Sequence, residues 1–566
     1  MLAGASPSSA RTLARGHVAA ACLALLLFLP GVWWGVPHAT APERTRPWGV
    51  DDETPLGPLA EIHNIVEPKP DRNLGYPLMY SFMSSAASAP LLGWWYVTGD
   101  WTSPSTVYPY GFRDPAAAIA RLGLVAHLVT MIMAIATVVA CFDIGRVALG
   151  RAGAWITAAT AALAFPMAYY ARTGNVDMTM IGFSAIAHAA FTRCVVLGIT
   201  RRRALVMGAA IGFALATKEA ALGAFLPLPF LMLWLRRNQA GELRSWSAWR
   251  PLLAALLIAF LSLGIGSGLF VDPGRYFDHL RFISGRLDTL AAGGTQVVPT
   301  FAYSAAGHVA YARALVHDLA DILSWPGLLL AFAGLAWTLA RRDRLALLAA
   351  PPIAYVIWIF LTLRAAQLRY MLPVAPLFAP FIAIAVQRAL ATRRSLGTAA
   401  AAIAGVALAL LLLRSADLSW QMLRDSRYAA AEWLREHTAP GDRIEYFGPS
   451  QKLPPLDSGI VAAFAAPYRG MYVAPDVSDA AADRILAGWL VRRPAFVIAI
   501  ADFTSEPGSP HSRSFPPQLF TAMLGNGTAF RLVAFFQTPR LFPWLSMPAL
   551  DYPTVNPPIR LFRGPW

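Results

Sequence analysis

The sequence has few charged residues and almost no lysine. Charged side chains make up 14% of its 566 residues, against roughly 25% in ordinary soluble domains. Hydrophobic residues make up 56%, and the only lysines are Lys69, Lys218 and Lys452. Because an unpaired charge is costly in hydrocarbon, this composition predicts an α-helical polytopic membrane protein and argues against a soluble one.

Cysteine is also scarce, and no CxxC pair occurs. Cys22, Cys141 and Cys194 lie within or at the ends of apolar runs, which excludes a disulfide framework and a cysteine-based zinc site. The formal charge of +15 comes from short arginine clusters between apolar runs. That distribution argues against nucleic acid as a partner and favours contact with membrane lipids.

Eleven apolar runs of roughly transmembrane length follow one another. The first run, at about 18–36, follows Arg11 and Arg15, so as an uncleaved anchor it places the N-terminus in the cytoplasm. A signal peptide cleaved near Ala39-Thr40-Ala41 is the alternative. The other runs lie at about 119–141, 152–170, 178–198, 204–217, 220–235, 251–270, 322–340, 345–363, 372–390 and 398–414.

Arginine clusters occupy alternate connections between these runs. They lie at 146–151, 201–203, 236–250, 341–344 and 388–394. The positive-inside rule makes these connections cytoplasmic, and it leaves the loops 37–118 and 271–321 and the C-terminal tail outside. We therefore expect a multi-pass protein of the inner (plasma) membrane, with a transmembrane domain at 1–414 and a soluble extracytoplasmic domain at 415–566.

Two outer segments have recognisable local patterns. In the first loop, the apolar stretch 76–97 is interrupted by prolines, and we expect it to form helices lying in the interface, anchored by Trp94, Trp95 and Tyr96. The tail begins with a helical pattern at 428–437, and strand-like runs follow at 495–500 and 530–536. This order predicts a small α/β domain.

Four groups of polar residues fall at the expected outer ends of the runs. The first is Asp51-Asp52-Glu53, where a carboxylate held near the membrane would suit general-base chemistry. The alternative is a solvated acidic turn. The second contains Arg172, Asn175 and Asp177 at membrane depth. Its alternative is a plain turn, with Asn175 and Asp177 serving as turn residue and helix cap.

The other two groups contribute cations. Lys218-Glu219 stands between two short runs, where the alternative is a simple Lys–Glu pair, and Arg369-Tyr370 stands at another boundary, where the alternative is an interfacial anchor. Cations at one cavity suit a phosphate leaving group, and carboxylates suit activation of a hydroxyl.

The order and common sidedness of these motifs resemble the GT-C superfamily of membrane glycosyltransferases. The resemblance covers about residues 18–390 and is nearest to the protein O-mannosyltransferase and aminoarabinose-transferase types. The segment 431–441 also looks like the start of their soluble outer domain. The family keeps its first helix, which argues against cleavage. Its first motif is an acidic pair, which we align with Asp52-Glu53, leaving Asp51 as an extra carboxylate.

The resemblance implies an inverting glycosyltransferase. It would move a sugar from a polyprenyl-phosphate-linked donor to a lipid, glycan or protein acceptor on the outer face. Asp52 would take the acceptor proton, with Asp51 as the open alternative, and Glu53 and Asp177 would orient the substrates. Lys218, Arg172 and Arg369 would stabilise the lipid phosphate.

Alternatives stay open for the metal requirement and for the class of function. The mannosyltransferase-like branch is thought to need no metal, whereas the oligosaccharyltransferase branch uses a divalent ion, so we predict no cofactor. A polytopic transporter or lipid flippase is the alternative function. Against it, the charges cluster at the ends of the runs rather than at their middles, and the sequence contains no internal repeat.

Overall fold

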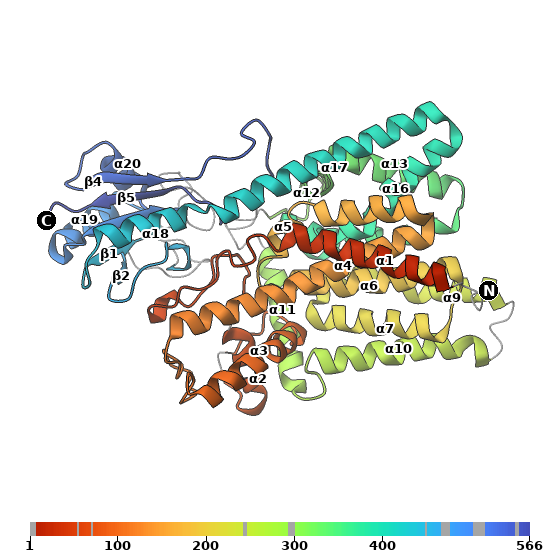
Figure 1. Cartoon of the computed structure of the whole chain (residues 1–566), viewed down its shortest axis with the longest axis horizontal. Helices are drawn as coiled ribbons and strands as arrows, with labels where there is room; N and C mark the ends of the chain where they lie inside the picture. Colours follow the sequence, from red (N-terminus) through yellow and green to blue (C-terminus); the bar gives the residue numbers. More distant parts are fainter. Residues whose placement is uncertain are drawn as a thin grey trace.

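The computed structural model describes residues 7–53, 56–69, 72–240, 246–291, 300–447, 450–465, 476–501, 515–548 and 554–566. Long helices lie roughly side by side at the N-terminal end of the molecule, and a small sheet lies at the opposite end of its long axis (Figure 1). The helices of the first half are α1 Pro7–Phe28, η1 Pro42–Arg44, α2 Leu56–Val66, α3 Met79–Thr98, α4 Pro115–Leu163, α5 Met167–Tyr170, α6 Val176–Leu197, α7 Arg201–Thr217, η2 Glu219–Ala221, α8 Leu222–Phe225, α9 Leu228–Ala240, α10 Trp246–Gly266 and α11 Pro273–Ala291.

The second half adds further helices and all the described strands. The helices are α12 Ala305–Leu323, α13 Trp325–Ala340, η3 Arg344–Ala349, α14 Ala350–Thr362, α15 Leu368–Met371, α16 Val374–Thr392, α17 Arg394–Leu423, α18 Ser426–His437, η4 Ser450–Lys452, α19 Asp479–Arg492 and α20 Pro517–Leu524. The strands are β1 Arg443–Tyr446, β2 Val461–Phe464, β3 Phe496–Ile500, β4 Arg531–Phe536 and β5 Ile559–Arg563.

Helical structure covers most of each of the eleven expected apolar runs, although α1 ends at Phe28, before the end of the first run. By length and composition, seven helices within the described ranges can cross a membrane, or eight if α12 and α13, bent by 105°, count as one span. The seven are fewer than the expected runs because α7 and α13 are shorter, because α1 is apolar only over Arg15–Phe28, and because α4 contains two runs. Gly150 divides α4, since its φ of 76° and ψ of −163° are not helical and its positive φ favours glycine.

The stretch 76–97 differs from the expectation of several helices. It forms the single helix α3, which continues through Pro90. Of the expected anchors, Trp94 and Tyr96 are exposed, whereas Trp95 is buried and packs edge-on against Phe112. The interfacial position of α3 stays a prediction.

The C-terminal tail folds as the α/β unit that its pattern predicts. Its sheet has the order β2-β1-β3-β5-β4, with β1 parallel to β2 and β3, and β5 antiparallel to β3 and β4. The predicted helix and both predicted strands are confirmed as α18, β3 and β4. However, α17 continues to Leu423, so the expected domain boundary at 414/415 lies inside a helix.

The segment that follows α1 is joined to this C-terminal unit by hydrogen bonds. Arg44 donates to the carbonyls of Leu456, Asp457 and Ile460. Nearby, the fully buried Asp425 accepts from Trp34 Nε1 at 3.0 Å and pairs with Arg427. Because these contacts lie just before residues 45–53 in the sequence, they restrict where the segment with the acidic motif begins.

Candidate active site

The acidic motif is a tight turn bonded to the loop that precedes α6. Asp52 Oδ1 accepts from the Gly174 N–H at 2.8 Å, and the Glu53 N–H donates to the Gly174 carbonyl at 2.7 Å. A Cβ at Gly174 would lie 2.8 Å from the Tyr80 hydroxyl and 3.0 Å from Asp52 Oδ1, so this close approach requires glycine. The structure therefore joins the first two sequence motifs through backbone contacts.

Asp52 is sealed inside the protein by a buried histidine of α4. Its Oδ2 lies 3.1 Å from His127 Nε2, while His127 Nδ1 donates to the Val32 carbonyl at 2.7 Å. The Asp52 side chain is 1% exposed. Both of its oxygens are engaged and no substrate can reach them directly, so the geometry disfavours our alignment of Asp52 with the catalytic base.

Asp51 is the accessible member of the motif. Its backbone φ of 53° turns it away from its neighbours, and its carboxylate pairs with Arg369 of α15. The Arg369 guanidinium is buried and also donates from Nε to Gln367 at 2.8 Å. At 27% exposure, Asp51 fits the role of base better than Asp52 does.

Lys218 forms the ion pair that joins α7 to α6. Its Nζ lies 2.6 Å from Asp177 Oδ1 in the first turn of α6, and both side chains are buried. The same Nζ lies 5.5 and 5.6 Å from the ring centres of Tyr76 and Tyr370, within cation–π range. The alternative of a Lys218–Glu219 pair is therefore wrong, because Asp177 is the partner of Lys218.

Arg172 and Asn175 serve the structure of the loop. Arg172 donates to the carbonyls of Leu27 and Phe28, at 2.6 and 3.1 Å, and to Ser419 at 2.8 Å. It thus caps the end of α1, whose last carbonyls have no helical partner, and it does not join the cations around Lys218. Asn175 caps α6 by accepting from the Met178 N–H, as the alternative of a plain turn with a helix cap predicted.

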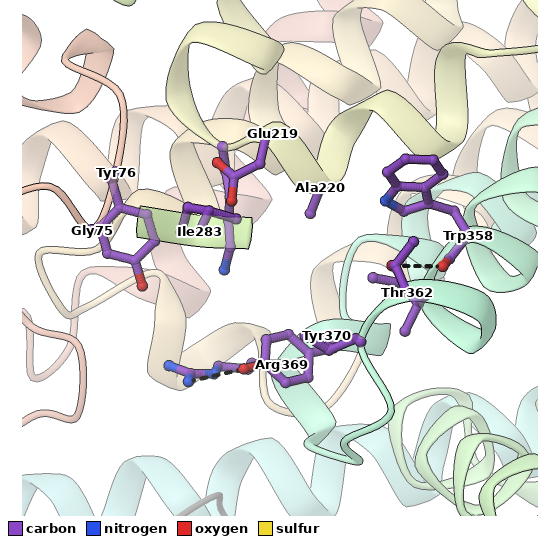
Figure 2. A pocket seen from close by; sticks show the side chains of 12 residues that line it. Gly75, Tyr76, Glu219, Ala220, Ile283, Trp358, Thr362, Arg369 and Tyr370 are labelled. Atoms are coloured by element: carbon purple, nitrogen blue, oxygen red, sulfur yellow. Dashed lines mark hydrogen bonds between the residues drawn. The ribbon is translucent and has the colours of Figure 1, made fainter. Parts of the chain in front are cut away.

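A cavity of about 120 Å³ opens beside Lys218 and Arg369. Figure 2 shows Tyr76, Glu219, Trp358 and Tyr370 around it, with Arg369 next to Tyr370. The lining combines aromatic rings, two cations and one carboxylate, and its residues are Gly75, Tyr76, Lys218, Glu219, Ala220, Ile283, Trp358, Ile359, Thr362, Leu363, Arg369 and Tyr370. The third and fourth sequence motifs therefore meet at one cavity.

Several residues of this region belong to none of the four sequence motifs. They are Tyr76 and Trp358, which line the cavity, and His127 and His279, which hold carboxylates. Only His127 carried a usable signal, since an ionisable residue in the middle of an apolar run is a functional candidate by default. The other three depend on contacts between distant segments.

Glu53, the third carboxylate of the turn, lies where its charged form is unfavourable. Burial raises the pKa of Glu53 to about 7, and the nearby charges of Asp52 and Glu61 raise it further. A carboxyl group with this pKa exchanges protons near neutral pH. No group of three or more His, Cys, Asp or Glu that could hold a metal occurs within the described ranges, and the expectation of no metal remains a prediction.

Comparisons with known proteins give low similarities. No protein-family model and no curated protein matches the sequence. Among solved structures, the chain is similar to ArnT from Cupriavidus metallidurans in the apo state, with 15% identity, a TM-score of 0.47 and coverage of 98% of both chains. The undecaprenyl-phosphate complex of that protein has 15% identity and a TM-score of 0.46, covering 96% of this chain and 97% of that one.

An archaeal structure is similar over less of its length. The oligosaccharyltransferase of Archaeoglobus fulgidus in complex with Zn and sulfate has 12% identity and a TM-score of 0.46, covering 86% of this chain and 68% of that one. Because identities and TM-scores are low throughout, the functional assignment depends on the residues of this chain.

Proposed function

We propose that this chain is a GT-C-type glycosyltransferase that moves a sugar, with inversion, from a polyprenyl-phosphate-linked donor to an acceptor at the outer membrane surface. One observation carries the proposal: Lys218 and Arg369, both buried, reach a single cavity from different helices. A buried cation needs a partner, and each has a carboxylate partner. Two cations beside an open cavity suit a phosphodiester, which is singly charged.

The cations act on the leaving group. When the sugar departs, the lipid phosphate gains a second negative charge, so a cation at that oxygen stabilises the transition state more than the ground state. Lys218, held between the rings of Tyr76 and Tyr370, is already positioned for this task. Asp177 is 2% exposed and does not line the cavity, so we assign it the task of holding Lys218 in place rather than of contacting a substrate.

Asp51 is the group that we assign to the acceptor proton. Its partner Arg369 also lines the cavity, so the donor phosphate and Asp51 compete for one guanidinium. Binding of the donor draws Arg369 toward the phosphate and frees the carboxylate. The base would then become available only when the donor is in place.

The sidedness follows from the arginine pattern and places the cavity, the C-terminal unit and the acceptor outside the cytoplasm. The acceptor is a hydroxyl or amine on a lipid, glycan or protein. The test is to incubate the purified protein in detergent with radiolabelled polyprenyl-phosphate sugars and membrane acceptors. Consumption of one donor with release of polyprenyl phosphate supports a transferase, whereas movement of lipid across vesicles without cleavage would support a flippase and overturn the proposal.

The role of Lys218 has its own test. Lys218→Met should weaken binding of polyprenyl phosphate and lower kcat about 10²-fold, as the removal of one preorganised donor does. Asp177→Asn is the matched control, because it breaks the same ion pair but keeps the cation. If Asp177→Asn weakens phosphate binding as much as Lys218→Met does, the ion pair is only structural.

A further inference from the structure

Glu219 occupies a distinctive place in the cavity. Among the described residues that line the cavity, it alone carries a carboxylate. Its neighbour Lys218 pairs with Asp177 and not with Glu219. Glu219 is also 34% exposed, so it can meet a ligand. The reaction described above gives it no task.

A histidine of helix α11 faces this carboxylate. Glu219 Oε2 lies 3.4 Å from His279 Nε2, and His279 Nδ1 lies 2.7 Å from the Leu74 carbonyl. A carbonyl can only accept, so Nδ1 carries a proton, and Nε2 attracts the carboxylate when it carries a second proton. The His279 ring is 1% exposed, so it is fixed by its surroundings and keeps Glu219 at the cavity wall.

An aromatic surface completes this part of the cavity. Trp358 of α14 lies across the cavity from Glu219 in Figure 2. Its position depends on Gly223 of α8, where a Cβ would lie 2.5 Å from the Trp358 Cβ. A carboxylate that can accept a hydrogen bond, together with a flat apolar ring, matches a sugar, which presents hydroxyls at its edge and C–H groups on its faces.

We infer that Glu219, positioned by His279, binds hydroxyl groups of the donor sugar, with Trp358 packing against the sugar ring. The inference rests on the proposed function and deepens it by dividing the cavity in two. Lys218 and Arg369 hold the phosphate, and Glu219 and Trp358 recognise the sugar. A carboxylate beside a phosphate would repel it, so Glu219 fits the neutral part of the donor. Donors without adjacent hydroxyls should therefore be poor substrates.

The test compares two lipids on detergent-purified protein: polyprenyl phosphate without a sugar, and the polyprenyl-phosphate sugar consumed in the transfer assay. Glu219→Gln should leave the Kd of the bare lipid phosphate within about twofold. It should weaken the sugar-bearing donor about tenfold to a hundredfold, the size of lost hydrogen bonds to a charged group. A donor that lacks the contacted hydroxyl should bind the wild type as weakly as the full donor binds Glu219→Gln. Because the two changes remove the same contact, Glu219→Gln should bind this truncated donor only slightly more weakly than the wild type does.

Asp272→Asn is the matched control. Asp272 also joins α11 to the first outer loop, through Arg72 at 2.6 Å, but it does not line the cavity. A purely structural role of Glu219 predicts that both variants change both lipids alike, and that result would overturn the inference. If Glu219→Gln does not fold, Glu219→Asp is the second variant, because it keeps the charge but shortens the side chain by one methylene. It too should weaken binding of the sugar-bearing donor more than binding of the bare lipid phosphate.

The two proposals fail differently. Wild-type protein that binds neither lipid overturns the glycosyltransferase proposal and this inference together. Wild-type protein that binds both lipids, with Glu219→Gln and Glu219→Asp binding them equally well, overturns the sugar subsite alone.

Discussion

Two carboxylates in this protein each face a histidine that is oriented in the same way. In each case a histidine donates from Nδ1 to a backbone carbonyl and faces a carboxylate with Nε2. One set of residues is Val32, His127 and Asp52, and the other is Leu74, His279 and Glu219. The carboxylate is 1% exposed in the first set and 34% exposed in the second. The same local chemistry therefore stabilises a turn in one place and presents a charge to a cavity in the other.

The difference comes from what surrounds each carboxylate. Asp52 also accepts from Gly174 and lies among α1, α4 and the loop before α6, which leaves no room for a ligand. Glu219 begins a short helix at the wall of the cavity, and its side chain is 34% exposed. Residue type and hydrogen-bond partners alone thus do not separate a structural carboxylate from a functional one, whereas access to the cavity does.

The largest expected effect separates Asp51 from the sealed Asp52. Asp51→Asn should lower turnover about 10²–10⁴-fold, the size of a general-base contribution. The unfolding temperature should fall less than in Asp52→Ala, because asparagine can still accept a hydrogen bond from Arg369. Steady-state transfer rates and thermal unfolding of the same preparations check this. Full activity of Asp51→Asn, with an inactive but equally stable Asp52→Asn, would break the comparison and restore Asp52 as the base.

The next effect tests whether Asp52 is structural. Asp52→Ala leaves His127 without its carboxylate and Gly174 without its acceptor, so the free energy of unfolding should fall by about 3–5 kcal/mol. Denaturation in detergent measures it, with His127→Gln as the partner variant. Because the two residues share one interaction, the double variant should lose less than the sum of the single losses. Additive losses would contradict the pairing.

A smaller effect concerns the neighbouring Glu53. Its pKa in the folded protein is raised to about 7 from 4.5, so between these values the unfolded chain ionises while the folded protein stays protonated. The contribution of Glu53 to stability should therefore be most favourable below pH 4.5 and become less favourable by up to about 3 kcal/mol as the pH rises to 7. Unfolding temperatures across this range check it, and Glu53→Gln should flatten the slope. An equal slope in Glu53→Gln would assign the titration to another group.

The smallest effect concerns the stability contribution of Glu219. Its side chain is partly exposed and its contact with His279 is 3.4 Å long, so Glu219→Ala should change the free energy of unfolding by no more than about 1 kcal/mol. Parallel denaturation with Asp52→Ala gives the contrast directly. If Glu219→Ala lowers the free energy of unfolding as much as Asp52→Ala does, then both histidine–carboxylate contacts are structural.

Some of the site was accessible from sequence. The motifs around Lys218, Asp177, Arg369 and Asp51 do meet, because each lies at an end of an apolar run and helix ends on one side of a bundle are neighbours. Arg172 shares that position, but its side chain caps α1 instead. The direction in which a side chain points from a helix end depends on which carbonyls and carboxylates lie near it in the fold.

The sequence alone determined the helices, the α/β tail and the placement of charges at the ends of the apolar runs, because these follow from the cost of charge in hydrocarbon and from local periodicity. The tertiary structure alone decided that Lys218 pairs with Asp177, that His127 seals Asp52 and that His279 presents Glu219 to a cavity. Each of these contacts joins residues at least 41 positions apart, and no local pattern encodes which distant carboxylate a buried cation or histidine will meet.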